Sequence, residues 1–384
     1  MLSMDNKMLS KIVVPQTIDN DSDYKNRLTE SFDAYFKYIS ANQCFNLSPE
    51  EITCTEKICQ TILKALNLYF EGRIQAATSK IEGLLGEFKK SMFIVCNLDD
   101  CYAFRMVGRI KEMQVQNHNY DFLSNSELSF FRARVSNTPL TELKEISHIP
   151  VCDRWKTNAE RYSIAGIPCL YLCVSTFSCW KEADCPSNST LYCSSIRFNE
   201  KGKSKKILNF TLPLKLLLGL DIGNDVCENQ LHPDLIKMYP LVLATSFHVE
   251  QKDRKFKSEY VISQLIMHCL KKLEIDGVAY MSTKSKGEMD FPLNVCLALP
   301  VFDEQSFDNT FELTYPISLE KYLNMNNKEQ YKTRSFINGY YKTKEDTIVG
   351  LSDIPYFKNS IYSAFDDYLV NQKHESVSVE EGED

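Results

Sequence analysis

No part of the 384-residue sequence is apolar over the ~20 consecutive residues that a membrane-spanning helix requires. The longest apolar patch, at residues 212–220, is interrupted by Pro213, Lys215 and Gly219. The opening residues, MLSMDNKMLSKIVVPQ, also lack the apolar run of a signal peptide. We therefore expect a cytoplasmic protein that does not associate with membranes.

The sequence also lacks an excess of positive charge. Its 44 Lys and Arg residues are outnumbered by 51 Asp and Glu residues, which gives a formal net charge of −7. A general nucleic-acid-binding protein normally carries a basic face. The composition therefore argues against direct binding of nucleic acid. A local basic groove is still compatible with this composition. Hydrophobic residues make up 43% of the chain, so a packed core is feasible.

Cysteine is abundant, but the 14 cysteines lack the spacings of a zinc site. The densest run, Cys173, Cys179, Cys185 and Cys193, has the pattern C-x5-C-x5-C-x7-C, which is not a zinc spacing. In a reducing compartment, cysteines are mostly small buried apolar residues without disulfides. We expect structural cysteines and no metal.

The first part of the chain is predicted to be helical. Residues 1–22 are polar and end in DNDS, which predicts a flexible leader. The sequence Ser48-Pro49-Glu50-Glu51 is typical of a helix start, with a serine cap, proline at the first position and acids in the first turn. Apolar residues then recur at helical spacing, first at Ile58, Ile62, Leu63, Leu66 and Phe70 and again from Ile74. Residues 23–127 are therefore predicted to form a helical accessory domain.

The pattern changes after residue 128. Short β-like runs occur at residues 169–176, 206–214, 241–247, 277–282 and 293–300. A single strong helical pattern lies among them, at residues 256–273. Strands with few intervening helices predict an α+β core, over residues 128–366. Residues 367–384 hold few apolar residues and end in EEGED, so we expect an acidic disordered tail.

A strand-to-helix corner lies in RYSIAGIPCLYLCVSTFSCWKE, residues 161–182. The AGIP turn begins a strand in which alternation puts Tyr171 on a mixed face and its leucine neighbours on a core face. Ser175 or Thr176 can cap a short helix that must end before Pro186 and that carries Glu182. From periodicity alone, Glu182 is most simply a surface residue.

Two further stretches carry candidate polar residues. In FFRARV, alternation places Arg132 and Arg134 on one face of a strand, where they are either solvated or form a fork for a diphosphate together with Arg161. These two interpretations are equally favoured. In YMSTKSKG, Ser282 follows a short strand, but the stretch lacks the spaced glycines of a P-loop.

Together, the segments FFRARV, RYSIAGIPCLYLCVSTFSCWKE and FKSEYVISQLIMHCLKKLEIDGVAYMSTKSKG resemble the RES domain, a family named for a recurring arginine, glutamate and serine. The resemblance covers roughly residues 129–300. It implies a fold similar to the ADP-ribosyltransferase toxins, with a split β-sheet core that binds NAD. The chain is longer than typical members, which makes the region before residue 129 an N-terminal helical addition.

The resemblance also implies roles for individual residues. The three name-giving positions would be Arg132, Glu182 and Ser282, with Arg134 as a substitute for Arg132 because the stretch up to Arg161 is expanded. Arg132 and Arg161 would hold the diphosphate, and Glu182 would stabilise positive charge at the ribose. Tyr171 would stack on the nicotinamide, and Ser282 would bond the ribose or orient Glu182.

Members of this family are toxins of bacterial toxin–antitoxin pairs that consume NAD by hydrolysis or phosphorolysis, or that ADP-ribosylate a protein. Their antitoxins are typically helix-turn-helix proteins of the Xre type that block the pocket. The resemblance thus implies an NAD-cleaving enzyme with NAD as its substrate and such an antitoxin as its partner. The alternatives are an ADP-ribosyltransferase with a specific protein target and a non-catalytic NAD-binding module.

Overall fold

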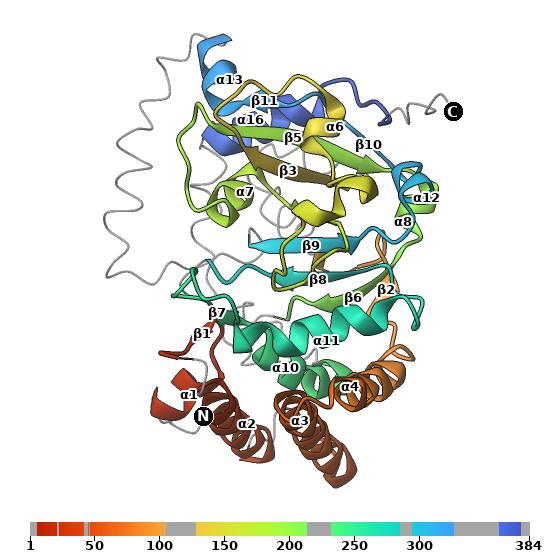
Figure 1. The fold of residues 1–384 in the computed structure, drawn as a ribbon. Helices are drawn as coiled ribbons and strands as arrows, with labels where there is room; N and C mark the ends of the chain where they lie inside the picture. Colours follow the sequence, from red (N-terminus) through yellow and green to blue (C-terminus); the bar gives the residue numbers. More distant parts are fainter. Residues whose placement is uncertain are drawn as a thin grey trace, which may run out of the picture. The chain divides into compact units, whose positions relative to one another are not determined.

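The computed structural model describes residues 6–20, 23–41, 45, 47–101, 103–104, 128–212, 232–284, 294–325 and 361–377. The chain has a mixed fold of helices and sheets (Figure 1). It divides into two units that each collect separate stretches of sequence. Unit 1 comprises Met1–Asn97, Asn158–Ala165 and Lys206–Glu288, and unit 2 comprises Leu98–Thr157, Gly166–Lys205 and Met289–Asp384.

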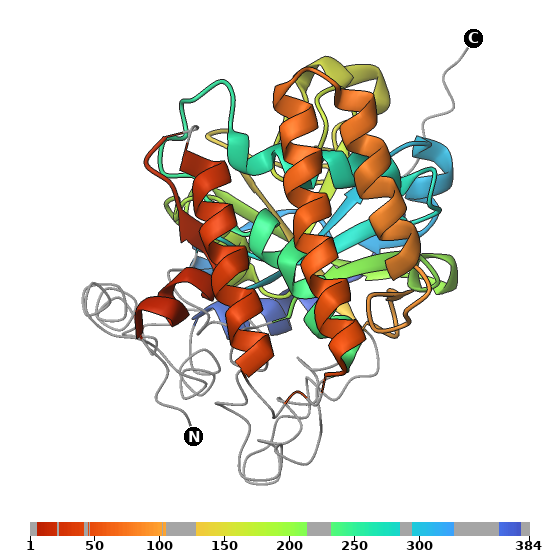
Figure 2. The same cartoon turned by 90° about the horizontal axis from the view of Figure 1, so that it is seen from below.

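Unit 1 is built mainly from helices. Its helices are α1 (Asn6–Ile12), α2 (Asp23–Ala41), α3 (Pro49–Phe70), α4 (Ile74–Phe88), α10 (Pro233–Thr245) and α11 (Val261–Leu270), with a 3-10 turn, η4 (Ser258–Tyr260). The predicted start of α3 is confirmed, because Ser48 and Glu51 form a reciprocal capping box. Figure 2 shows α2, α3 and α4 side by side, with α3 packed on α10 and α4 on α11.

Two groups of strands complete unit 1. Strand β6 (Lys206–Phe210) lies between β8 (Gly277–Met281), to which it is parallel, and β2 (Val95–Asn97), to which it is antiparallel. A separate parallel pair joins β1 (Gln16–Thr17) to β7 (Phe247–His248). Every residue of β8 is buried, as expected for a strand covered on both faces.

Unit 2 contains an antiparallel sheet in the order β10-β5-β3-β4-β9, with β11 also paired to β5. The strands are β3 (Ser129–Val135), β4 (Cys169–Cys173), β5 (Leu191–Phe198), β9 (Val295–Pro300), β10 (Phe311–Leu313) and β11 (Ile317–Ser318). Helices α7 (Thr176–Glu182) and α16 (Ile361–Val370) pack together, with α7 against β3 (Figure 1).

Shorter helices connect the strands of unit 2. They are α6 (Leu143–Ile146), η2 (Val151–Lys156), α8 (Glu200–Lys203), α12 (Glu304–Asp308) and α13 (Leu319–Met325). Helix α12 begins at the cap Asp303, whose carboxylate accepts a hydrogen bond from the Ser306 amide.

One predicted strand is wrong. Residues 241–247 were expected to be a strand, but most of them belong to helix α10, and β7 starts only at Phe247. The helix starts with a cap at His232 and proline at the first position. All residues from Met238 to Thr245 are buried, and a continuous apolar run does not distinguish a buried helix from a buried strand.

The ends of the chain are more ordered than expected. Helix α1 and strand β1 lie within residues 1–22, for which the sequence predicts a flexible leader. At the other end, α16 extends to Val370, and Glu375 forms a β-bridge with Leu313, within the predicted disordered tail. Contacts from distant parts of the chain order both segments. Residues 378–384, and residues 105–127 of the predicted accessory domain, lie outside the described residues.

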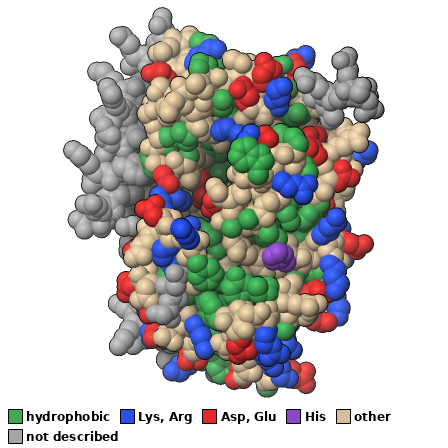
Figure 3. Space-filling model, viewed as in Figure 1, with side chains coloured by type: hydrophobic (Ala, Val, Ile, Leu, Met, Phe, Trp, Pro, Cys, Tyr) green, Lys and Arg blue, Asp and Glu red, His purple; other side chains and the backbone are tan. Residues whose placement is uncertain are grey.

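The surface in Figure 3 carries Lys and Arg side chains interspersed with Asp and Glu, so neither sign of charge dominates the face in view. Within the described ranges, none of the helices combines the length and the apolar character needed to cross a membrane.

Candidate active site

Strand β3 carries Arg132 and Arg134 in unit 2. The two arginines lie opposite Ser194 and Tyr192 of strand β5. Residues two apart on a strand project to the same face, and both arginines are half-buried there, while Phe131 is buried on the other face. The predicted strand, with both arginines on one face, is therefore confirmed, although Phe130 on that face is buried and Val135 on the other face is exposed.

Both guanidinium groups bond backbone carbonyl oxygens. Arg132 donates from Nε to Ile146 and from Nη1 to Tyr171, the latter at 3.0 Å. Arg134 donates from Nη2 to the Ser147 carbonyl oxygen at 2.9 Å. The register between β3 and β4 is a single pair, Phe131 with Cys173. The Tyr171 carbonyl that accepts the Arg132 bond lies two residues before Cys173 on β4.

The electrostatics of this pair favour an anion. Burial and the neighbouring Arg134 guanidinium lower the pKa of Arg132 to about 10. Burial also lowers the pKa of Arg134, against the opposing charge of Glu145. Within the described part of the chain, no carboxylate forms an ion pair with Arg132 or Arg134. Two like charges that bond only neutral oxygens would gain stability from a bound phosphate or carboxylate.

Strand β4 has the two faces that its sequence predicts. Leu170 and Leu172 are buried in the core, whereas Tyr171 is half-buried. Burial raises the pKa of the neighbouring Cys169 thiol to about 12. Tyr171 therefore lies beside a thiol that stays protonated at neutral pH.

Helix α7 starts directly after this strand, and two side chains accept hydrogen bonds from its first turn. Ser175 accepts a hydrogen bond from the Ser178 amide at 3.1 Å, so Ser175 is the cap. The buried carboxylate of Asp366, on α16, accepts from the Thr176 amide at 2.9 Å and from the Thr176 hydroxyl at 2.5 Å. The two contacts fix the start of the helix that ends in Glu182.

Glu182 is half-buried at the last residue of α7. The pKa of the nearby Cys173 thiol is raised well above its usual value, first by the neighbouring Cys179 thiol, then by burial, and least by the charge of Glu182. Two residues with positive φ, Asp184 and Cys185, then end the helix before Pro186. Glu182 therefore lies near the end of strand β4 and is not a fully solvated surface residue.

In unit 1, the buried side chain of Arg161 links three backbone segments. Its side chain is 9% exposed, and its Nη2 donates to the Met281 carbonyl oxygen at 2.9 Å. Its Nη1 donates to the Thr245 carbonyl oxygen at 3.5 Å. The guanidinium carbon lies 4.5 Å from the centre of the Tyr280 ring, close enough for a cation–π interaction. Arg161 thereby joins residues 158–165 to the ends of α10 and β8.

Ser282 directly follows β8 and is 5% exposed. Its hydroxyl accepts a hydrogen bond from the Lys284 amide at 3.1 Å. His248, on β7, lies near the backbone of Thr283, and burial lowers the pKa of its imidazole. Unit 1 thus gathers Arg161, Ser282 and His248 along one short stretch of backbone.

The sequence-predicted residues therefore fall into two groups. Unit 2 holds Arg132, Arg134, Tyr171 and Glu182, and Arg132 contacts β4 at Tyr171. Unit 1 holds Arg161 and Ser282, which are linked through Met281. Asp366 and His248 were missed, because a single acid on a distant helix and a lone histidine beside a two-residue strand carry no local motif.

Comparison with known proteins adds one relative. No protein-family model matches the chain. The chain is 26% identical over 322 residues to a protein of Bacillus subtilis (strain 168) named "Putative toxin YopC". The similarity covers 79% of this chain and 67% of the relative.

Among solved structures, the chain is similar to one from the crystal structure of the M. tuberculosis MbcT–MbcA toxin–antitoxin complex. The sequence identity is 13% and the TM-score is 0.27, with 50% of this chain and 84% of that chain covered. A similarity at this level does not establish a shared fold.

Proposed function

We propose that this protein is a toxin that cleaves the bond between nicotinamide and ribose in NAD. The proposal rests on the RES-like motifs of the sequence and on the similarity to a protein named as a toxin. The single structural observation that carries it is the arginine pair on β3, Arg132 and Arg134, which bonds neutral carbonyl oxygens and lacks a described carboxylate partner. Such a pair suits the diphosphate of a dinucleotide.

The proposed chemistry assigns one role to each side chain. Loss of nicotinamide leaves positive charge on the ribose, so the Glu182 carboxylate stabilises the transition state more than the ground state. Arg132 holds the diphosphate, and Tyr171 stacks on the nicotinamide ring. Arg161 holds the backbone that carries Ser282, and the Ser282 hydroxyl is assigned to the nicotinamide ribose. The core is then of the ADP-ribosyltransferase type.

The acceptor of the ADP-ribosyl group defines the reaction. Incubation of the purified protein with NAD, with and without phosphate, followed by mass analysis, distinguishes the products. Free ADP-ribose indicates hydrolysis, a phosphorylated ADP-ribose indicates phosphorolysis, and a protein with added mass indicates transfer. NAD that stays intact both with and without phosphate would contradict the proposal, and binding of NAD without turnover would indicate a non-catalytic binding module.

A toxin that depletes NAD needs an inhibitor in the cell that makes it. We therefore propose an antitoxin partner, of the helix-turn-helix type that the resemblance implies, which covers the residues assigned to NAD. Expression of the protein alone should stop growth, and co-expression of the antitoxin should restore it. Growth unaffected by expression of active protein would contradict the toxin assignment.

A further inference from the structure

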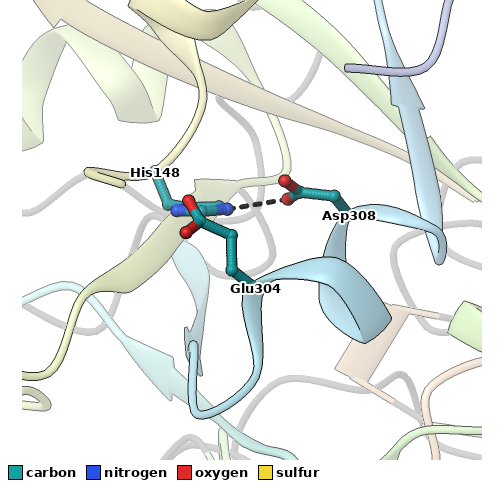
Figure 4. Close-up of side chains that lie close together, drawn as sticks. All are labelled: His148, Glu304 and Asp308. Carbon is teal, nitrogen blue, oxygen red and sulfur yellow. Dashed lines mark hydrogen bonds and ion pairs between the residues drawn. The ribbon is translucent and has the colours of Figure 1, made fainter. Parts of the chain in front are cut away.

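His148, Glu304 and Asp308 form a cluster of three ionisable side chains in unit 2 (Figure 4). One potential ligand atom from each residue lies within 4.8 Å of the other two. His148 is 3% exposed and Asp308 is 6% exposed, while Glu304 is half-buried. None of the three has a role in the proposed NAD chemistry, so the cluster needs its own explanation.

The three side chains come from two parts of the fold. His148 lies between α6 and η2, and Glu304 and Asp308 lie at the two ends of α12. Glu304 Oε2 accepts a hydrogen bond from the Val151 amide at 3.1 Å, which leaves Oε1 for a further ligand. The ring of Phe307, 5.6 Å from the His148 ring, closes the cluster on its apolar side.

The hydrogen bonds of His148 indicate a cation between its ring and Asp308. The His148 Nδ1 atom lies 2.9 Å from the Ile149 carbonyl oxygen, which can only accept, so Nδ1 carries a hydrogen. The His148 Nε2 atom lies 2.7 Å from the Asp308 Oδ1 atom, which is an acceptor when ionised. A proton or a metal ion must therefore lie between Nε2 and Oδ1.

The charge of the cluster favours the metal ion. With a proton on Nε2, the imidazolium offsets one of the two carboxylates, and one negative charge remains in a largely buried place. A divalent cation bound to neutral His148 and both carboxylates leaves no net charge. Burial of an uncompensated charge is costly, so a bound divalent ion would remove the charge that remains when a proton bridges the pair.

We propose that His148 Nε2 and the carboxylates of Glu304 and Asp308 bind a divalent transition-metal ion. One imidazole and two carboxylates suit Mn²⁺ or Zn²⁺. The bond from Nδ1 to the Ile149 carbonyl is the outer contact that typically fixes the tautomer of a metal-binding histidine. Metal–ligand bonds of about 2.1 Å place adjacent ligands roughly 3 Å apart, so the ion displaces the proton to solvent and opens the pair slightly.

The ion would also secure the arginine pair. The carbonyl oxygens of Ile146 and Ser147, directly before His148, accept hydrogen bonds from Arg132 and Arg134. A metal ion would bind this segment to α12 and so hold those carbonyls in place. Any effect on NAD turnover rests on the proposed function, whereas metal binding itself does not.

Binding of Mn²⁺ to the full-length protein tests the site, with free Mn²⁺ measured by electron paramagnetic resonance. Mn²⁺ is the probe because cysteine thiolates prefer softer ions, and this chain has 14 cysteines. We expect Glu304→Gln and Asp308→Asn each to weaken binding by at least about 10-fold. The control Glu312→Gln, an exposed glutamate on β10 of the same unit, should bind as the wild type does.

Competition with other metal ions and measurement of proton release give two further tests of the site. Zn²⁺ should displace Mn²⁺, and Mg²⁺ at the same concentration should not, because Mg²⁺ prefers oxygen ligands. Calorimetry in buffers of different ionisation enthalpy should show proton release on binding. No binding of Mn²⁺ at millimolar concentration, or equal affinity in wild type and Glu304→Gln, would overturn the site and leave a proton-bridged ion pair. Because Glu304 is half-buried, its variant decides the outcome even if Asp308→Asn does not fold.

Discussion

Arg161 donates a hydrogen bond of 2.9 Å to the carbonyl oxygen of Met281, the residue directly before Ser282. Arg161 and Met281 are 120 residues apart in the sequence. Two side chains that the sequence nominates for one site are thus joined through the backbone of unit 1. Arg161 holds the backbone that carries Ser282. This structural role is additional to any contact that Arg161 makes with a ligand.

Arg161→Lys is expected to destabilise the fold by about 1–3 kcal/mol, because a lysine cannot reach both carbonyl oxygens with a planar fork or stack on Tyr280 in the same way. Urea denaturation measures the change in the free energy of unfolding. The exposed Arg154 offers the control Arg154→Lys, which should lie near the wild type. An Arg161→Lys protein as stable as wild type would show that these contacts of Arg161 contribute little to the free energy of unfolding.

Glu182→Gln should fold normally and lose NAD turnover by about 100- to 1,000-fold, because one electrostatic contact with the transition state is worth about 3–4 kcal/mol. The rate of nicotinamide release measures the effect. Glu200→Gln is the control, since the Glu200 side chain is 90% exposed. Turnover at the wild-type rate in Glu182→Gln would remove Glu182 from the mechanism.

Arg132→Gln is expected to weaken NAD binding more than Arg134→Gln, by about 10-fold or more, because the Arg132 guanidinium reaches strand β4 at Tyr171. Each variant should also reduce the dependence of the NAD dissociation constant on salt. Titrations of NAD at two ionic strengths test both points. A larger loss in Arg134→Gln would make Arg134 the main diphosphate ligand.

Stability is expected to fall as the pH is lowered through about 6.5, the usual pKa of histidine, partly because of His248. Burial lowers the pKa of the folded His248, and Lys284 adds to this effect. Between the folded pKa and about 6.5, the unfolded chain binds more protons than the folded one, so stability rises with pH there and is complete above this window. Urea denaturation over a pH series should show a flatter profile for His248→Gln. A profile as steep as that of the wild type would exclude His248 as a contributor.

Local sequence was enough to determine several elements. The Ser48–Glu51 capping box, the Ser175 cap and the alternation of β3 and β4 all depend on residues a few positions apart, so their chemistry is visible in the sequence. The prediction of a strand at residues 241–247 is wrong. Its apolar residues are buried in α10, and the periodicity of a fully buried segment does not distinguish a helix from a strand.

The tertiary structure alone decided which polar groups meet. Asp366 caps α7 from 190 residues away, and His148 bonds Asp308 across 160 residues. Pairings of this kind depend on how strands and helices are ordered in space, and no local periodicity or spacing encodes that order. The sequence by itself nominated the arginines, the glutamate and the serine, and the fold determined what each one contacts.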